Sequence, residues 1–283
     1  MTPGIVYDDT ICLLGEGPLW HPLRKELFWF DIIGRTLHRK GEHWRFERIV
    51  TAAGWIDEDR LLVASDRALS MFHISTGQST EICPLEADNP ATRSNDGRAD
   101  PQGGFWIGTM SLGEEKGAGA IWRWHRGELR KIFPGITIPN AICFAPDGQT
   151  AYFADTPEKV IRRTALDDEG WPVGESVIHV DLRDTPHFPD GAVVDSEGTL
   201  WNAQWGSFRV AAYDRAGQEV AEIPFPAAQT SCPAFGGDGL KTLFCTSAAA
   251  GQSQRHLVDN PETGRTFATR LSVAGQEEHR VIL

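Results

Sequence analysis

A short apolar and aromatic segment recurs six times along the 283 residues, and this repeat constrains the fold more than any other feature. Each copy follows a turn rich in Asp, Gly or charged residues. The copies are centred on Trp29, Leu62, Trp106, Phe153, Trp201 and Phe244, at successive separations of 33, 44, 47, 48 and 43 residues. Apart from the compressed first interval, these match the ~40–50 residues of a four-stranded propeller blade. The sequence therefore predicts an all-β fold, a six-bladed β-propeller with mostly four-stranded antiparallel blades.

The sequence between the repeats favours turns and hairpins over helices. Residues 146–148 (Pro-Asp-Gly) and 196–198 (Ser-Glu-Gly) provide the fixed and positive φ angles that tight turns use. Residues 120–124 alternate in character and, with residues 127–130, are typical of an outer hairpin. No helical periodicity persists over a dozen residues. A β-sandwich is the competing all-β fold, but it gives no reason for the period, so we expect residues 1–283 to form a single propeller domain.

The charge balance argues against a nucleic-acid or anionic-membrane partner. The chain has 27 Lys+Arg and 39 Asp+Glu, a formal net charge of −12, and phosphate binding needs a basic patch. The amino end lacks a basic region followed by an apolar run, and no stretch approaches the ~18 apolar residues of a spanning helix. We expect a cytoplasmic protein, and the sequence does not indicate its oligomeric state.

The five cysteines are odd in number and widely spaced, and most lie within apolar runs. This distribution is typical of reduced, buried thiols that pack as small apolar groups. It does not match a disulfide framework or the ligand spacing of a zinc site.

The repeat also predicts which residues meet at the propeller axis, because one end of every innermost strand lies there. Positions 11 to 13 residues before four of the six centres hold Glu16, Asn95, Asn140 and Asp190. Each has Gly or Pro close by, which restricts or sharpens the backbone. The other two blades offer only residues 49–51 and 231–233, which are weaker ligands.

Each of these motifs alone is ordinary turn chemistry. Four in matching register, two of them carboxylates pointing inward, would be costly without a cation. The all-oxygen donor set favours one hard divalent ion, Ca²⁺ first, with Mg²⁺ and Mn²⁺ as alternatives and Zn²⁺ less favoured by donor type. Two carboxylates would neutralise such an ion and leave positions for water and substrate, an arrangement that favours catalysis.

At the same residues the chain resembles the gluconolactonase family, also called the regucalcin or senescence marker protein family. The matching motifs lie at residues 15–20 (Gly-Glu-Gly-Pro-Leu-Trp), 93–101, 108–110 (Gly-Thr-Met), 139–141, 146–148 and 189–191, with further likeness at 235–237 and 246–248. The resemblance covers nearly the whole chain. It implies a six-bladed propeller, a single divalent metal held by Glu16, Asn140 and Asp190, and hydrolysis of sugar lactones.

The resemblance further implies that Arg93 and Asn95 contact the substrate. A third family contact, a Glu shortly after Gly-Thr-Met, falls by count on Gly113, and Glu114 is the adjacent carboxylate. For catalysis, Asp190 is our candidate for orienting or deprotonating the attacking water.

Three alternatives to a lactonase remain. A calcium-binding regulatory propeller would keep the metal without lactone turnover, and a related metal-dependent esterase would act on another ester. A propeller that binds peptides or proteins would not require inward-facing Glu16 and Asp190.

Other residues have more ordinary interpretations. We expect His187 to make a structural hydrogen bond in a loop rather than to touch substrate. Most tryptophans are expected in the blade cores, with Trp20 and Trp205 as the two that follow site motifs closely enough to contact a sugar. Residues 113–119 follow a strand but open no helix, so we interpret them as a mobile flap rather than a phosphate loop.

Overall fold

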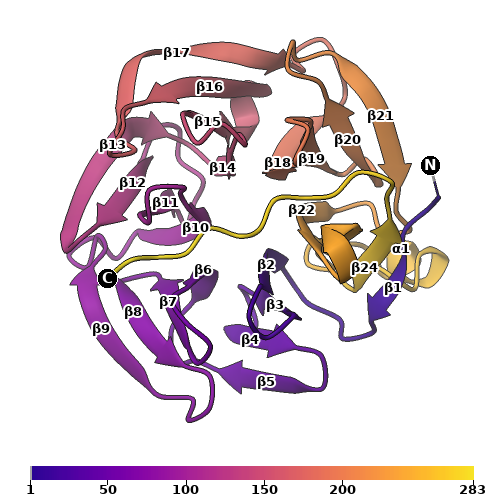
Figure 1. Cartoon of the computed structure of the whole chain (residues 1–283). Coiled ribbons are helices and arrows are strands. Elements are labelled where there is room, and N and C mark those ends of the chain that lie inside the picture. Colours follow the sequence, from indigo (N-terminus) through magenta and orange to yellow (C-terminus); the bar gives the residue numbers. More distant parts are fainter. Residues whose placement is uncertain (1) are drawn as a thin grey trace.

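Six four-stranded antiparallel sheets surround a central axis in the computed structural model, which describes residues 2–283 (Figure 1). This arrangement confirms the predicted six-bladed β-propeller. Named from the innermost to the outermost strand, the first blade is β2 (Gly15–His21), β3 (Glu26–Asp31), β4 (Thr36–Arg39), β5 (Glu42–Arg45), and the second is β6 (Val50–Trp55), β7 (Arg60–Ser65), β8 (Ala68–His73), β9 (Ser79–Pro84). The third blade is β10 (Thr92–Ala99), β11 (Phe105–Ser111), β12 (Gly119–His125), β13 (Glu128–Ile136), and the fourth is β14 (Pro139–Phe144), β15 (Thr150–Asp155), β16 (Val160–Leu166), β17 (Pro172–Asp181). The fifth blade is β18 (Phe188–Val194), β19 (Leu200–Trp205), β20 (Arg209–Tyr213), β21 (Glu219–Pro224), and the sixth is β22 (Thr230–Gly236), β23 (Thr242–Ser247), β24 (Thr266–Arg270), β1 (Ile5–Asp8).

The last sheet is assembled from both ends of the chain. Its outermost strand, β1, pairs antiparallel with β24, with Ile5 opposite Ala268. The N-terminal strand thereby completes the sixth blade and closes the ring. The repeat did not predict this role for the first residues, because β1 lies outside any copy of it.

Burial decreases from the axis outward. All six residues of β14 are buried, whereas β9, at the outer edge of its sheet, is almost entirely exposed. Inner strands are covered on both faces by neighbouring blades, which explains their nearly continuous runs of apolar and small residues. The six centres of the repeat all lie in the second strand of a blade and are 0–3% exposed.

Aromatic side chains fill the spaces between neighbouring blades. Trp106 of β11 packs edge to face against Phe144 of β14, with ring centroids 5.4 Å apart. Phe133 of β13 stacks on Phe153 of β15 at 4.4 Å. Such pairs add about 0.5–1.5 kcal/mol beyond burial of their area, so they help to hold neighbouring blades together.

The cysteines are free thiols, as expected from the sequence. Four are buried and only Cys83 is partly exposed.

The single α-helix within residues 2–283 is α1 (Gln254–Asp259), between β23 and β24. The Ser253 side chain caps it by accepting a hydrogen bond from the His256 backbone N–H. No helix in the described residues has the length and apolar character needed to cross a membrane.

Every innermost strand carries a register shift near its start. The shifts fall between Glu16 and Leu19, Val50 and Ala52, Ser94 and Gly97, Asn140 and Cys143, Pro189 and Ala192, and Thr230 and Pro233. A bulge leaves residues outside the ladder and redirects their side chains. Gly17 and Ala141, which follow Glu16 and Asn140, have left-handed φ angles of 52° and 55°. At Gly17 a Cβ would come within 2.4 Å of the Thr51 carbonyl oxygen, so glycine is required there.

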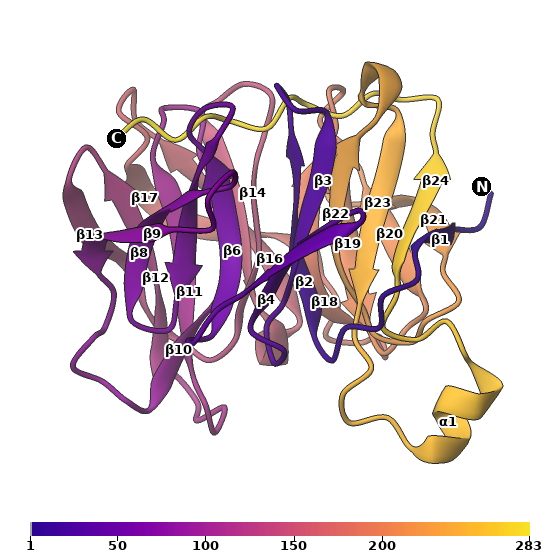
Figure 2. The same cartoon turned by 90° about the horizontal axis from the view of Figure 1, so that it is seen from below.

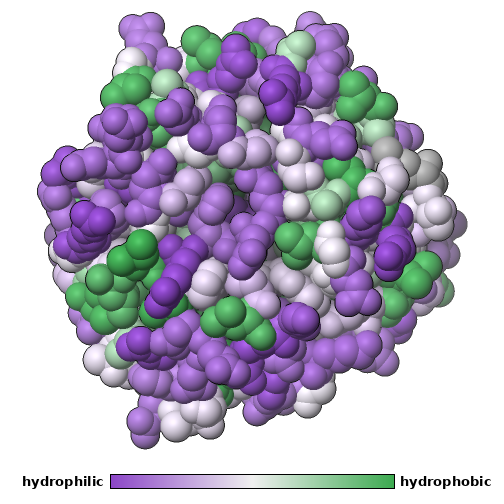
Figure 3. Space-filling model, in the orientation of Figure 1, coloured by the Kyte–Doolittle hydropathy of each residue, from purple (hydrophilic) through white to green (hydrophobic). Residues whose placement is uncertain are grey.

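The C-terminal segment, residues 271–283, crosses the end of the ring where the inner strands finish (Figures 1 and 2). Its backbone is hydrogen-bonded to several blades in turn: Gly275 N–H to the Leu240 carbonyl at 2.8 Å and Val281 N–H to the Trp55 carbonyl at 2.9 Å. The face that this segment crosses is largely hydrophilic, with apolar side chains in scattered patches (Figure 3).

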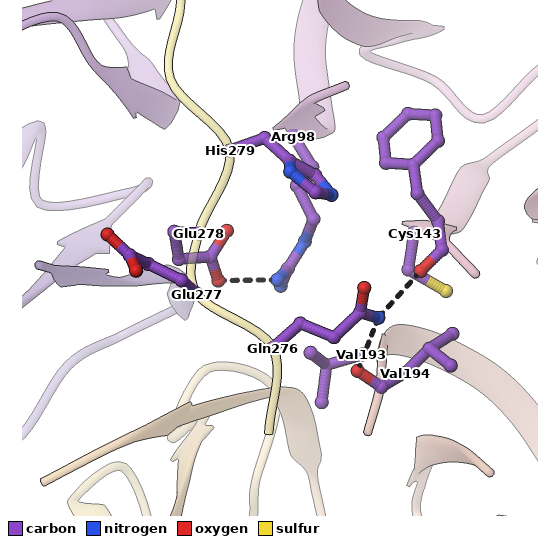
Figure 4. Close-up of a pocket in the computed structure, with 9 residues that line it drawn as sticks. Arg98, Cys143, Val193, Val194, Gln276, Glu277, Glu278 and His279 are labelled. Atoms are coloured by element: carbon purple, nitrogen blue, oxygen red, sulfur yellow. Dashed lines mark hydrogen bonds and ion pairs between the residues drawn. The ribbon is translucent and has the colours of Figure 1, made fainter. Parts of the chain in front are cut away.

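Two side chains of this segment reach toward the axis (Figure 4). The Gln276 amide donates to the backbone carbonyls of Phe144 and Val194, at 3.0 and 2.9 Å. Glu278 accepts from Arg98 Nη1 at 2.6 Å in a buried ion pair. The space left beside them is only about 20 Å³, so the C-terminal segment closes this end of the propeller.

Candidate active site

At the opposite end, where the inner strands begin, the propeller contains a cavity of about 460 Å³. Strands β2, β10, β14 and β18 contribute its polar wall, together with the segment after β15 and the loop after β11. The polar lining residues are Glu16, Arg93, Asn95, Glu114, Asn140, Thr156 and Asp190. The structure thus gathers all the residues proposed for the site from sequence around one cavity, and adds Thr156.

The two carboxylates are buried and electrostatically strained. Glu16 is 6% and Asp190 5% exposed. Burial, reinforced by the charge of Asp96, raises the pKa of Glu16 to about 8. Burial and the charges of Glu16 and Asp96 raise the pKa of Asp190 well above its usual value, and the opposing effect of Arg93 is smaller. A bound divalent cation would reverse this balance by supplying the missing positive charge.

Hydrogen bonds link the side chains of Arg93, Asn95 and Asn140 along the cavity wall. Arg93 Nη1 donates to Asn95 Oδ1 at 2.8 Å and to the Ser94 carbonyl at 2.8 Å. Asn95 Nδ2 donates to Asn140 Oδ1 at 3.0 Å and to the Pro139 carbonyl at 2.9 Å. The guanidinium and both amides are therefore held in fixed positions at the cavity wall.

Asp96 was not predicted as a site residue, and it does not line the cavity. It is 6% exposed, and its Oδ2 accepts from the Ile142 N–H at 2.8 Å. Burial raises its pKa to about 6. Ile142 lies in the bulge of β14, where the ladder offers no partner, so Asp96 stabilises the bulge that positions Asn140. The Asn-Asp-Gly sequence suggested only a turn, because the need for this acceptor arises in the neighbouring blade.

Glu114 lines the cavity, whereas Gly113, the position obtained by counting, does not. Glu114 has a left-handed φ of 56°, and its charge favours the charged form of Arg93, whose pKa is lowered by burial. The neighbouring Glu115 accepts a hydrogen bond from the Ser111 hydroxyl instead. That residues 113–119 act as a mobile flap stays a prediction.

Apolar side chains form the rest of the wall, among them Leu14, Ile138 and Phe188. Asp31 and Asp155 occupy corresponding places in their blades and hold two of these segments. Asp31 Oδ1 accepts from the Leu14 N–H at 3.0 Å, and Asp155 Oδ1 accepts from the Ile138 N–H at 2.8 Å. The apolar wall is thus as firmly fixed as the polar one.

The aromatic and histidine candidates separate clearly. Trp205 lines the cavity, while Trp20 stacks on Phe244 in the core at 5.7 Å. His187 lies outside the cavity lining, and its Nδ1 is hydrogen-bonded to Ser207 Oγ at 2.9 Å. His187 therefore has the structural hydrogen bond that the sequence suggested.

The donor set fits a hard cation. Within residues 2–283, no three His, Cys, Asp or Glu side chains are grouped so that they could hold a metal ion. Glu16, Asn140 and Asp190 line one cavity and offer a cation two carboxylates and an amide oxygen. Carboxylate and amide oxygens are the ligands of Ca²⁺ and Mg²⁺ rather than of softer metals.

Comparison with known proteins assigns the chain to a family. Residues 14–249 match the family described as SMP-30/Gluconolactonase/LRE-like region. The chain belongs to this family. The resemblance predicted from the sequence motifs is thereby confirmed.

Several known proteins are similar to this chain over almost its whole length. The L-arabinolactonase of Azospirillum brasilense is 36% identical over 285 residues, covering 96% of this chain and 93% of that protein. The pentonolactonase of Haloferax volcanii is 34% identical over 284 residues, covering 96% of each. The crystal structure of regucalcin, a calcium-binding protein from Agrobacterium tumefaciens strain C58, has a TM-score of 0.96 at 38% identity and covers 100% of this chain and 99% of that one.

Proposed function

We propose that this protein is a lactonase that hydrolyses a sugar lactone to the aldonic acid, using a divalent cation bound by Glu16, Asn140 and Asp190. The observation that carries the proposal is the convergence of these three oxygen ligands with Arg93 and Asn95 on one cavity of about 460 Å³. That volume is within the range of small-molecule sites. The lactonases among the relatives support the substrate class.

Lactone hydrolysis requires a polarised carbonyl, an attacking water and stabilisation of the oxyanion. When bound, a divalent cation supplies Lewis acidity that stabilises negative charge on the lactone carbonyl oxygen. Asp190 orients the water and accepts one of its protons as the new C–O bond forms. The same proton then passes to the ring oxygen as the ring C–O bond breaks, leaving the open hydroxy acid.

The chain's other residues orient the lactone. Arg93 and Asn95 are held in place by their mutual hydrogen bond and hydrogen-bond the ring substituents. Glu114 accepts from a sugar hydroxyl at the cavity mouth. Trp205 and Phe188 of the apolar wall cover the C–H face of the ring and exclude water from it.

The deciding experiment is a panel of five- and six-membered aldonolactones assayed with Ca²⁺, Mg²⁺, Mn²⁺ and Zn²⁺ after chelation. We expect turnover of at least one lactone to disappear with the metal and to return when a divalent ion is added. The melting temperature should rise with the ion, because binding favours the native state. Undiminished turnover after verified metal removal would contradict the cation-dependent mechanism.

A second candidate function is calcium binding without lactone turnover, which the similarity to a calcium-binding regucalcin favours. Tight Ca²⁺ binding combined with no hydrolysis of any lactone in the panel would support it over the lactonase.

A further inference from the structure

We infer that Thr156 is a positioning residue: its hydroxyl fixes the Asn140 amide with the oxygen toward the cation and ties Asn140 to the strand that carries Asp190. This inference rests on the proposed cation site. Thr156 is the first residue of a short 3-10 turn (Thr156–Glu158) directly after β15, and it lines the cavity.

Thr156 bridges two blades through one oxygen atom. Asn140 Nδ2 donates to Thr156 Oγ1 at 2.8 Å. Thr156 Oγ1 in turn donates to the Pro189 carbonyl at 2.7 Å. Pro189 immediately precedes Asp190, so a single hydroxyl connects the side chain of one proposed ligand to the backbone of another.

The direction of these hydrogen bonds follows from groups that have only one role. The Pro189 carbonyl can only accept, so the Thr156 hydroxyl must donate its single proton there. Thr156 Oγ1 can then only accept from Asn140, which must present its NH₂ group to it. The Asn140 oxygen consequently faces the other way, toward Asn95, which lines the same cavity.

The far end of the chain of hydrogen bonds imposes the same direction. The Arg93 guanidinium only donates, and it donates to Asn95 Oδ1. The Pro139 carbonyl only accepts, and it takes a hydrogen bond from Asn95 Nδ2. Asn95 therefore also presents its NH₂ group to Asn140 Oδ1. The amide orientations thus do not depend on distinguishing nitrogen from oxygen by shape.

The bulge in β18 explains why a side chain is needed at this place. The register shift between Pro189 and Ala192 removes ladder partners from successive carbonyls. Thr156 satisfies Pro189, and Asn202 Nδ2 donates to the carbonyls of Asp190 and Gly191 at 2.9 and 3.1 Å. Asn202 holds only the backbone of β18, whereas Thr156 also orients Asn140.

Removing the hydroxyl therefore has a specific consequence. Thr156→Val keeps the branched shape but leaves Asn140 Nδ2 and the Pro189 carbonyl unpaired. Only the hydrogen bond from Asn95 then holds the Asn140 amide in its orientation, so its NH₂ group turns toward the cation more readily. Thr156→Ser retains the hydroxyl. Thr269→Val is the matched control, because Thr269 Oγ1 also donates to a backbone carbonyl, that of Thr2 at 3.0 Å, and Thr269 does not line the cavity.

The test measures Mn²⁺ affinity by calorimetric titration of the chelated proteins. Thr156→Val should weaken the Mn²⁺ Kd by about 10–100-fold, as loss of a partner behind a metal ligand does. Thr156→Ser should restore most of the affinity, and Thr269→Val should leave it unchanged. Melting of the metal-free proteins reports the purely structural effect, which should be somewhat larger for Thr156→Val, because its hydroxyl has two partners and that of Thr269 has one.

A double-mutant cycle isolates the orientation of the amide. In the Asn140→Asp background both terminal atoms are oxygens, so Thr156→Val should have little effect on Mn²⁺ affinity there. An equal penalty in both backgrounds, or wild-type affinity in Thr156→Val, would overturn the inference while leaving the proposed function intact. Absence of Mn²⁺, Ca²⁺ and Mg²⁺ binding by the wild-type protein would overturn both.

Discussion

The two ends of the propeller axis differ in how their buried carboxylates are paired. At the closed end Arg98 Nη1 lies 2.6 Å from Glu278 Oε1. Burial lowers the pKa of Arg98, but Glu278 and other nearby groups together outweigh burial and raise it. Burial also raises the pKa of Glu278, against the opposing effect of Arg98. At the open end Glu16 and Asp190 line one cavity, and burial raises the pKa of each by more than the charge of Arg93 lowers it. The closed end thus pairs its buried carboxylate with a guanidinium at ion-pair distance, whereas Glu16 and Asp190 line a cavity in which a cation can take that place.

The two ends of the propeller axis also differ in the space that they offer to a ligand. The closed end leaves about 20 Å³ beside the C-terminal segment, whereas the open end has a cavity of about 460 Å³. A space of the smaller size holds at most a water molecule or so. The proposed substrate therefore fits only where the inner strands begin, beside Glu16 and Asp190.

The largest expected effect comes from changing a carboxylate at the open end. Asp190→Asn keeps an oxygen that can bind a cation but removes the proton acceptor. We expect kcat to fall by about 10²–10⁴-fold with partial metal occupancy retained. Turnover of the best lactone and metal content should be measured on the same samples, since an empty site would resemble a catalytic defect.

Asp96→Asn is the matched control for this variant. Asp96 is also a buried carboxylate near the same end, but it lies outside the cavity, and an Asn oxygen can still accept from the Ile142 N–H. Most of the turnover should survive. Near wild-type kcat in fully metallated Asp190→Asn would eliminate Asp190 as the proton acceptor.

Much of this contrast could be predicted at the open end and almost none of it at the closed end. The repeat places Trp106 and its counterparts in second strands, and counting back from them finds Glu16 and Asp190. Counting works because the connection between the first two strands of every blade is short, with four or five residues between the strand ends. The counts differ by two, 13 for Glu16 and 11 for Asp190, because the bulged segments pair in different registers with their neighbours.

The residues that were missed make contacts that occur once and follow no period. Thr156 acts through Asn140 and Pro189, and Asp96 acts through the bulge of the next blade. The C-terminal segment carries no copy of the repeat, so the pairing of Glu278 with Arg98, 180 residues away, is not visible in the sequence. Local sequence patterns predict the strands of each blade, whereas contacts between blades form only when the ring closes.

An intermediate effect is expected from breaking the ion pair at the closed end. Arg98→Ala leaves Glu278 buried without a partner and should lower the free energy of unfolding by about 3–5 kcal/mol, measured by urea denaturation. The kcat of the folded fraction should change little, because neither residue lines the active-site cavity.

The double variant Arg98→Met with Glu278→Leu tests the electrostatic cause. Replacing both charges with apolar groups should recover most of the lost stability. If the double variant is as unstable as Arg98→Ala, the closed end depends on packing of the arginine side chain rather than on pairing of charge.

The smallest effect expected is a pH dependence at the closed end. His279 packs edge to face near Phe144, with centroids 6.4 Å apart. Burial, opposed by the charge of Asp100 and assisted by that of Arg98, lowers the pKa of His279 below its usual 6.5. The unfolded chain therefore takes up a proton before the folded protein does as the pH falls. Stability due to neutral His279 is fully present above pH 6.5 and is lost as the pH drops through the interval below it.

His279→Gln isolates this contribution because glutamine does not titrate. Between pH 7.5 and 5.5, in the presence of a chelator, the unfolding free energy of the wild-type protein should fall more than that of the variant. The difference between the two proteins should be smaller than the loss expected for Arg98→Ala. Comparing the two proteins cancels the titration of Glu16, Asp190 and Glu278, which both share. Parallel pH profiles would mean that His279 is equally protonated in the folded and unfolded states, and would contradict this prediction.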